Sequence, residues 1–173
     1  MHLRLDDALL LRPLQLTDVE RMAALANDRN VWRNLRDAFP HPYSVENARG
    51  FVAHYTAPER TERVFAIELD GQFVGATGAH PLTDVYSRGA EIGYWLGAPF
   101  HGRGIATKAV GGLTKFAFEV MKLERLQAGV FEWNLASARV LEKNGFQREA
   151  VLKKSVFKDG QLIDSFLYAK LRG

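Results

Sequence analysis

The 173-residue chain contains no cysteine. This absence excludes disulfides, thiolate metal sites and a cysteine nucleophile, so any chemistry must use oxygen, nitrogen and backbone groups. The five histidines show no short metal-ligand spacing, and we expect no metal site. The chain also lacks an apolar run near the roughly 18 residues that a membrane-spanning helix requires, and charged residues occur close to its start. We therefore expect a cytoplasmic protein without a membrane partner.

The chain also has little excess charge of either sign. Its 23 Lys and Arg residues oppose 20 Asp and Glu residues, and the basic residues are spread along the sequence. Because the chain has neither a dense basic run nor a known nucleic-acid recognition motif, we expect no nucleic-acid partner. An anionic small molecule is partner enough to explain the slight excess of positive charge. The length and the 47% hydrophobic content predict one domain over residues 1–173. Monomer and homodimer both stay open.

Hydrophobic periodicity and turn residues predict alternating strands and helices. Asp70-Gly71 and Asp159-Gly160 have the composition of hairpin turns, Thr17 to Glu20 has the form of a capping box, and Ser44 is expected to cap a helix. The predicted order is strand, two helices, three strands, helix, strand, helix and two strands. This order implies an α/β (α+β) fold, with a mixed, mostly antiparallel sheet of about seven strands flanked by about four helices.

Residues 30–43 break this periodicity and carry several aromatic side chains, among them Trp32, Phe39 and Tyr43. Aromatic residues on a proline-containing loop can line a cleft. They can equally fill the core beneath the loop. The sequence leaves both interpretations open.

The segment from Glu91 to Thr107 has the clearest chemical pattern. A strand-like run ends in a glycine-bearing turn that leads directly into a helix. The first turn of a helix has unpaired N–H groups and a partial positive charge, and Gly102 and Gly104 would let the backbone approach a phosphate. A glycine turn without a ligand is the simpler alternative. The segment lacks the third glycine of a dinucleotide fingerprint and the Gly-Lys-Ser/Thr of a P-loop, which disfavours NAD and ATP.

This segment, together with Asn134-Leu-Ala-Ser137 and the following residues to Phe146, resembles the GNAT superfamily of N-acetyltransferases, and especially its branch that acetylates ribosomal-protein N-termini. The family loop reads Gln/Arg-x-x-Gly-x-Gly/Ala. Residues 101–106 match it, except that His101 stands at the first position. The resemblance covers nearly the whole chain and implies a GNAT-like fold and acetyl-coenzyme A as co-substrate.

The resemblance also assigns residues to the co-substrate. The loop amides are expected to hold the pyrophosphate, Leu96 to offer backbone hydrogen bonds to the pantetheine arm, and Asn134 to contact the cofactor from the opposite strand. For Asn134 an ordinary helix N-cap is the alternative. The implied cofactor-binding residues are Leu96, His101, Gly102, Arg103, Gly104, Ile105, Ala106, Thr107 and Asn134.

Two side chains are implied for catalysis. Glu91 resembles the family's carboxylate that takes the amine proton, and Ser137 could donate a proton to the departing sulfur. A strand-edge charge and an exposed first-turn residue are the respective alternatives. The family branch favours a peptide or protein N-terminal amine as the acceptor. A small amine such as a polyamine or aminoglycoside, or a module that binds acyl-coenzyme A without turnover, remain the competing functions.

Overall fold

The computed structural model describes residues 2–173, and these form one eight-stranded sheet in the order β1-β2-β3-β4-β5-β6-β8-β7. Neighbouring strands are antiparallel except β5 and β6, which are parallel. The expected mixed, mostly antiparallel sheet is confirmed, and the short β1 makes it one strand larger. The strands are β1 (Leu3–Arg4), β2 (Leu9–Pro13), β3 (Arg63–Leu69), β4 (Gln72–Pro81), β5 (Gly89–Leu96), β6 (Arg125–Phe131), β7 (Gln147–Lys158) and β8 (Gln161–Leu171).

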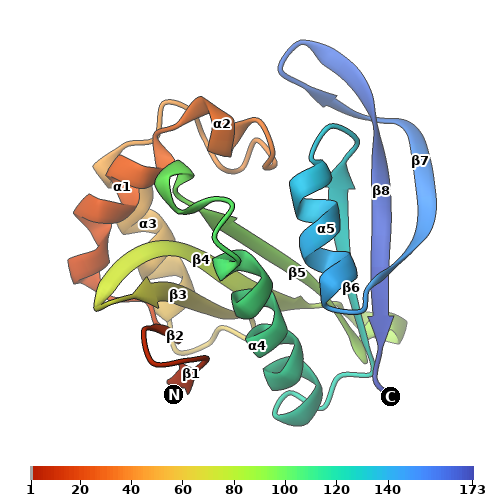
Figure 1. The fold of residues 1–173 in the computed structure, drawn as a ribbon, viewed down its shortest axis with the longest axis horizontal. Coiled ribbons are helices and arrows are strands. Elements are labelled where there is room, and N and C mark those ends of the chain that lie inside the picture. The colour runs from red at the N-terminus through yellow and green to blue at the C-terminus, as the bar shows by residue number, and fades with distance from the viewer. Residues whose placement is uncertain (1) are drawn as a thin grey trace.

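Helices cover both faces of the sheet (Figure 1). One core cluster joins α1 and α3 to one face, and the other joins α4 and α5 to the opposite face. The α-helices are α1 (Val19–Ala26), α2 (Arg29–Trp32), α3 (Val45–Thr56), α4 (Ile105–Glu119) and α5 (Leu135–Lys143). Short 3-10 turns occupy Leu16–Asp18, Asp84–Tyr86 and Ala98–Phe100. The helix beyond the expected four is α2, which lies in the stretch that the sequence left irregular.

Most of the predicted turns and caps are present. Asp70 and Gly71 have φ angles of 50° and 75°, and Asp159 and Gly160 have 52° and 75°, as two-residue hairpin turns require. The Ser44 hydroxyl accepts a hydrogen bond of 3.1 Å from the backbone N–H of Asn47 and so caps α3.

The capping box predicted at Thr17 is wrong. A 3-10 turn precedes α1, and the Asp18 carboxylate accepts a hydrogen bond of 2.8 Å from the backbone N–H of Gln15. Asp18 is buried and forms an ion pair of 2.6 Å with Arg12 of β2. A buried carboxylate needs such a partner, and this tertiary contact fixes the entry into the helix.

The sheet splits between β5 and β6. These strands pair over only three residues, Gly89–Glu91 with Arg125–Gln127. Beyond that point β5 continues beside β4 up to Leu96, whereas β6 continues beside β8 up to Phe131. The two halves of the sheet therefore diverge, as Figure 1 shows, and within residues 2–173 no strand pairs with the facing edges of β5 and β6 beyond this point.

Residues 27–43, which we call the cap segment, cross the open end of this split. Arg29 pairs with Asp159 at 2.8 Å, and Asp37 pairs with Lys158 at 2.6 Å, so two ion pairs join the segment to the β7–β8 turn. Asn34 accepts a hydrogen bond of 3.1 Å from the Trp133 indole, which follows β6. The cap segment thus connects the two halves of the sheet above the gap.

Candidate active site

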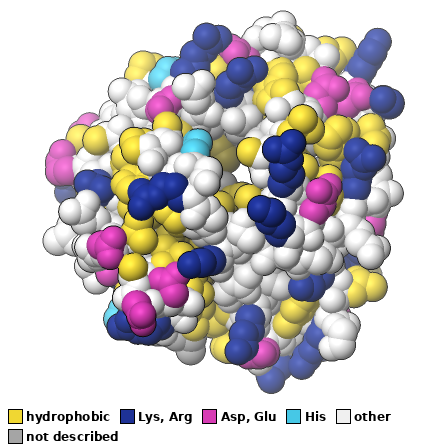
Figure 2. All heavy atoms as spheres, in the orientation of Figure 1, with side chains coloured by type: hydrophobic (Ala, Val, Ile, Leu, Met, Phe, Trp, Pro, Cys, Tyr) yellow, Lys and Arg dark blue, Asp and Glu magenta, His cyan; other side chains and the backbone are white. Residues whose placement is uncertain are grey.

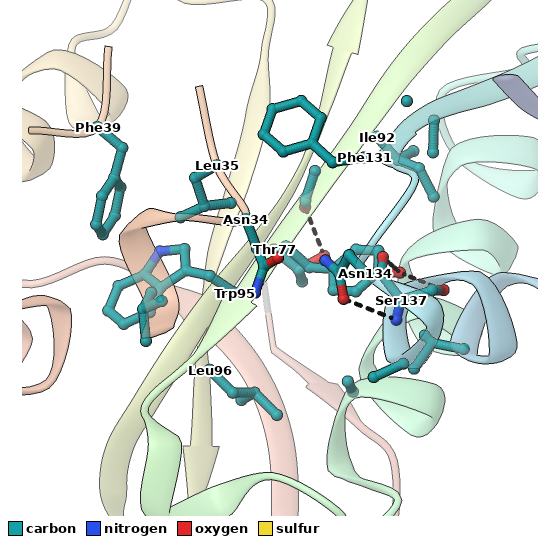
Figure 3. Close-up of a pocket in the computed structure, with 18 of the residues that line it drawn as sticks. Asn34, Leu35, Phe39, Thr77, Ile92, Trp95, Leu96, Phe131, Asn134 and Ser137 are labelled. Carbon is teal, nitrogen blue, oxygen red and sulfur yellow. Dashed lines mark hydrogen bonds between the residues drawn. The ribbon is translucent and has the colours of Figure 1, made fainter. Parts of the chain in front are cut away.

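A cleft of about 1280 Å³ fills the space between the two halves of the sheet. Figure 2 shows it as a hollow in the face of the molecule with Lys and Arg side chains around it. Its walls come from β4, β5 and the glycine turn on one side, and from β6 and α5 on the other, with the cap segment above. In Figure 3, Leu35 and Phe39 of the cap segment lie across the cleft from Phe131, Asn134 and Ser137.

The glycine turn presents free backbone N–H groups to the cleft. Gly102 and Gly104 have φ angles of 71° and 76°, and a Cβ built on either would meet nothing within 4 Å. Gly104 is the N-cap of α4, and within residues 2–173 the N–H groups of residues 102–107 donate to no acceptor. Consecutive free amides at a helix N-terminus bind phosphate. The turn therefore has the free amides that a phosphate group requires, and the assignment of the coenzyme A pyrophosphate to it stays a prediction.

The end of β5 also exposes backbone groups. The N–H of Gly97 donates to the Val74 carbonyl of β4 at 3.0 Å, so the N–H of Leu96 points the other way, into the gap. The His101 ring donates a hydrogen bond of 2.9 Å to the Leu96 carbonyl, which fixes the turn to the strand. The backbone N–H of Leu96 thus faces the gap, and its hydrogen bond to the pantetheine arm stays a prediction.

Arg103 is the predicted cofactor residue that does not line the cleft. It faces a smaller neighbouring hollow and lies 5.8 Å from the centre of the Phe100 ring. The remaining eight predicted cofactor residues line the cleft together.

Asn134 and Ser137 lie at the start of α5. The Asn134 side chain accepts a hydrogen bond of 3.2 Å from the backbone N–H of Ser137, so the N-cap interpretation is confirmed, and the residue still lines the cleft. The Ser137 hydroxyl forms a 2.7 Å hydrogen bond with the Tyr94 hydroxyl of β5. This contact crosses the gap between the two halves of the sheet. Burial raises the pKa of Tyr94 to about 12, so the phenol is neutral and carries its proton.

Glu91 lies at the point where β5 and β6 begin to diverge. Its carboxylate forms an ion pair with Arg36 of the cap segment, and its side chain is 31% exposed. His80 is its cross-strand partner on β4 and also lines the cleft. Burial lowers the pKa of His80, which keeps the imidazole neutral near pH 7. The sequence reasoning missed Tyr94 and His80, because both become recognisable only from the sheet register.

The aromatic residues of the cap segment separate into two roles. Tyr43 is 5% exposed and packs in the core, and Phe39 contacts it with ring centres 4.6 Å apart, yet both also line the cleft. Both interpretations therefore hold for these two. Trp32 lies outside the cleft, where Lys158 stands 3.7 Å from the centre of its ring.

Within residues 2–173 we find no group of three or more His, Asp or Glu side chains placed to hold a metal ion. No helix in the same range is long and apolar enough to cross a membrane.

Comparison with known proteins agrees with this geometry. The model of the acetyltransferase (GNAT) domain matches residues 8–147. The probable N-acetyltransferase YjcK of Bacillus subtilis is 33% identical over 164 residues, which cover 86% of each chain. Spermidine N(1)-acetyltransferase of Escherichia coli is 29% identical over 87% of this chain and 79% of its own. The solved structure of Mycobacterium smegmatis RimJ with CoA-disulfide superimposes with a TM-score of 0.83 at 29% identity, covering 94% of this chain and 81% of its own.

Proposed function

The chain belongs to the GNAT acetyltransferase family, and we propose that the amine it acetylates is the N-terminal α-amine of a peptide or protein. Membership makes it an N-acetyltransferase that uses acetyl-coenzyme A and an amine acceptor. The relatives leave the acceptor open, because their names include both a putative ribosomal N-acetyltransferase and a spermidine N(1)-acetyltransferase.

The charge of the cleft lining favours an N-terminal amine over a polyamine as the acceptor. Among residues 2–173 the lining contains a single carboxylate, Glu91, and it is already paired with Arg36. Two further arginines and one lysine, Arg33, Arg139 and Lys143, also line the cleft. A polyamine carries several positive charges and needs several carboxylates around it, because like charges repel at short range. A peptide N-terminus has only one amine to place beside Glu91, so a single carboxylate is enough for it.

The basicity of the acceptor supports the same choice. An α-amine with a pKa near 7.8 is about one-seventh neutral at pH 7, whereas a lysine amine near 10.4 is neutral at only about four parts in ten thousand. Acetyl transfer requires the neutral amine. A cleft with one carboxylate base and one neutral imidazole therefore suits an α-amine better than a lysine side chain.

The glycine turn and the end of β5 position the co-substrate. The amides of residues 102–107 hold the pyrophosphate, and the N–H of Leu96 faces the thioester end of the pantetheine arm. An N–H directed at the thioester oxygen stabilises the negative charge that develops there during attack. Asn134 forms the opposite wall while it caps α5.

Glu91 and Ser137 then move the protons. The amine nitrogen forms a bond to the acetyl carbon as the carbon–sulfur bond breaks. Glu91 accepts the proton that the amine loses, directly or through water, and Ser137 supplies a proton to the thiolate. Either hydroxyl can donate in the 2.7 Å contact between Tyr94 and Ser137; with Tyr94 as the donor, the serine proton is free for the sulfur and the phenol proton replaces it in a relay. A thiol with a pKa of about 8.5 can leave as the thiolate without strong help from an acid. We therefore expect Ser137 to contribute less to the rate than Glu91.

The test compares kcat/KM for three acceptor classes through release of free thiol from acetyl-coenzyme A. These are short peptides with free N-termini, the same peptides with a blocked N-terminus and one internal lysine, and polyamines. We expect the free N-termini to give the highest values. Higher activity on blocked lysine peptides or on polyamines than on every free N-terminus would overturn the proposal. If no candidate amine releases thiol although acetyl-coenzyme A binds, the chain is a binding module.

A further inference from the structure

Within residues 2–173, Arg33 is the one arginine of the cap segment that forms no ion pair. Arg29 pairs with Asp159 at 2.8 Å, Arg36 pairs with Glu91, and the segment's own Asp37 is held by Lys158 at 2.6 Å. Within residues 2–173 the Arg33 side chain has no ion-pair or hydrogen-bond partner, and its Nε is buried without an acceptor. An arginine that lines a cleft without an ion-pair partner is available to an anionic ligand that enters the cleft.

The guanidinium is also held in a fixed position. It stacks over the Trp133 ring, 4.8 Å from its centre, and the Trp133 indole in turn donates to Asn34 at 3.1 Å. Stacking on an aromatic face leaves the two terminal Nη groups of the guanidinium free, and these two groups match a carboxylate or phosphate with two parallel hydrogen bonds. Arg33 is therefore preorganised for an oxyanion before any ligand arrives.

The position of Arg33 identifies which ligand brings that oxyanion. The pyrophosphate amides lie at the start of α4, in residues 102–107, whereas Arg33 lies in the cap segment, which also provides the Arg36 that contacts Glu91. Figure 3 shows its neighbours Asn34 and Leu35 at the part of the cleft opposite Phe131. The cap segment thus borders the carboxylate that accepts the amine proton. An anion bound by Arg33 belongs to the acceptor.

We infer that Arg33 selects acceptors that carry a carboxylate or phosphate a few atoms from the reacting amine. This inference rests on the proposed function and sharpens it: the preferred acceptor is an N-terminus followed closely by an acidic residue. A charge-assisted hydrogen bond to such a group favours it over the uncharged analogue by roughly tenfold to a hundredfold.

The experiment uses three C-terminally amidated peptides that differ only at position 2, which is Asp, Asn or Lys. Serine and serinamide form a second matched pair, because only serine carries a carboxylate. This pair tests whether small acceptors also depend on a carboxylate. We measure kcat/KM with acetyl-coenzyme A, and calorimetry of the same ligands with the protein–coenzyme A complex gives the binding ratios without turnover. Spermidine serves as the cationic reference.

We expect the parent protein to prefer the Asp peptide to the Asn peptide by about tenfold or more, with the Lys peptide last. Arg33→Gln reduces the Asp to Asn ratio to near one, and Arg33→Glu shifts the preference to the Lys peptide. Arg49→Gln, a matched loss of charge on α3 outside the cleft, keeps the parent ratio. Affinity for acetyl-coenzyme A and the melting temperature of each variant show that it is folded.

Three outcomes would overturn the inference. The parent shows equal use of the Asp and Asn peptides, the Arg33 variants keep the parent ratio, or Arg33→Gln weakens acetyl-coenzyme A binding and leaves the acceptor ratio unchanged. The proposed function fails in a different way, when serine or spermidine is used and no peptide is. In that case the ratio of serine to serinamide still decides the role of Arg33.

Discussion

Replacing Gly104 by valine tests the pyrophosphate loop directly. Gly104 has a φ angle of 76°, caps α4 and lines the cleft. A Cβ built at this position meets no protein atom within 4 Å, so the valine side chain would occupy the space that the loop offers to phosphate. Gly160 is a matched control, because its φ angle is 75°, its Cβ position is equally open, and it lies outside the cleft.

Both substitutions strain the backbone, but only Gly104→Val is expected to block phosphate binding. A left-handed conformation costs an L-residue about 1–2 kcal/mol, which for a chain of this length lowers the melting temperature by roughly 2–8 °C in both variants. Gly104→Val also prevents the approach of charged phosphate to the amides. Loss of two charge-assisted hydrogen bonds, each worth about 1.5–3 kcal/mol, weakens acetyl-coenzyme A binding by roughly a hundredfold to ten-thousandfold.

Calorimetry and thermal denaturation, with and without coenzyme A, separate these effects. Ligand at a hundredfold excess over its dissociation constant stabilises the folded state by about 2.7 kcal/mol. The parent protein and Gly160→Val should both gain this stability, whereas Gly104→Val should gain almost none. The reasoning is refuted if Gly104→Val binds like the parent protein. It is also refuted if Gly160→Val loses affinity to the same degree, because backbone strain alone would then explain the loss.

Four further substitutions test the remaining steps. Glu91→Gln should lower kcat by roughly a hundredfold with unchanged acetyl-coenzyme A affinity, and a rate within about twofold of the parent would make Glu91 structural. Tyr94→Phe should lower kcat by about tenfold and leave KM for acetyl-coenzyme A unchanged, and an unaltered kcat contradicts the relay. Burial raises the pKa of Tyr43 to about 12, so between pH 10 and 12 the unfolded chain releases a proton that the folded chain keeps. This residue should therefore add a fall in stability of about 1.4 kcal/mol per pH unit, and urea titrations of Tyr43→Phe should give a pH slope smaller than that of the parent by this amount; an identical slope contradicts the assignment. Asp18→Asn should cost about 3–5 kcal/mol of unfolding free energy by leaving Arg12 partly unpaired, and a loss below about 1 kcal/mol contradicts that role.

Local backbone signals were predictable because they depend on few residues. Asp70-Gly71 and Asp159-Gly160 form the predicted hairpin turns. The glycines at 102 and 104 likewise adopt positive φ angles beside the start of α4. Such residues carry their conformational preference with them, whatever the rest of the chain does.

Features that depend on distant partners were missed or wrong. Nothing near Thr17 in the sequence shows that Asp18 is drawn to Arg12, and this buried ion pair outweighs the local capping pattern. The two-residue β1 is too short for a periodic signal, and it forms because β2 offers a free edge. The register that ends the pairing of β5 with β6 at Glu91 came only from the structure.

The same limit applies to the site, where the informative residues are those that close the gap from both sides. In the sequence Tyr94 is one apolar-face position of a strand between Ile92 and Leu96, and its tyrosine hydroxyl is the only sign that this face is not entirely core. Its role follows from a 2.7 Å contact with a residue 43 positions later. Glu91 and Arg36 are joined over 55 positions in the same way. The family pattern therefore predicts the co-substrate site within the backbone of one contiguous segment, while the side chains that we propose to select the acceptor come together only in the fold, from the cap segment, β4 and β5.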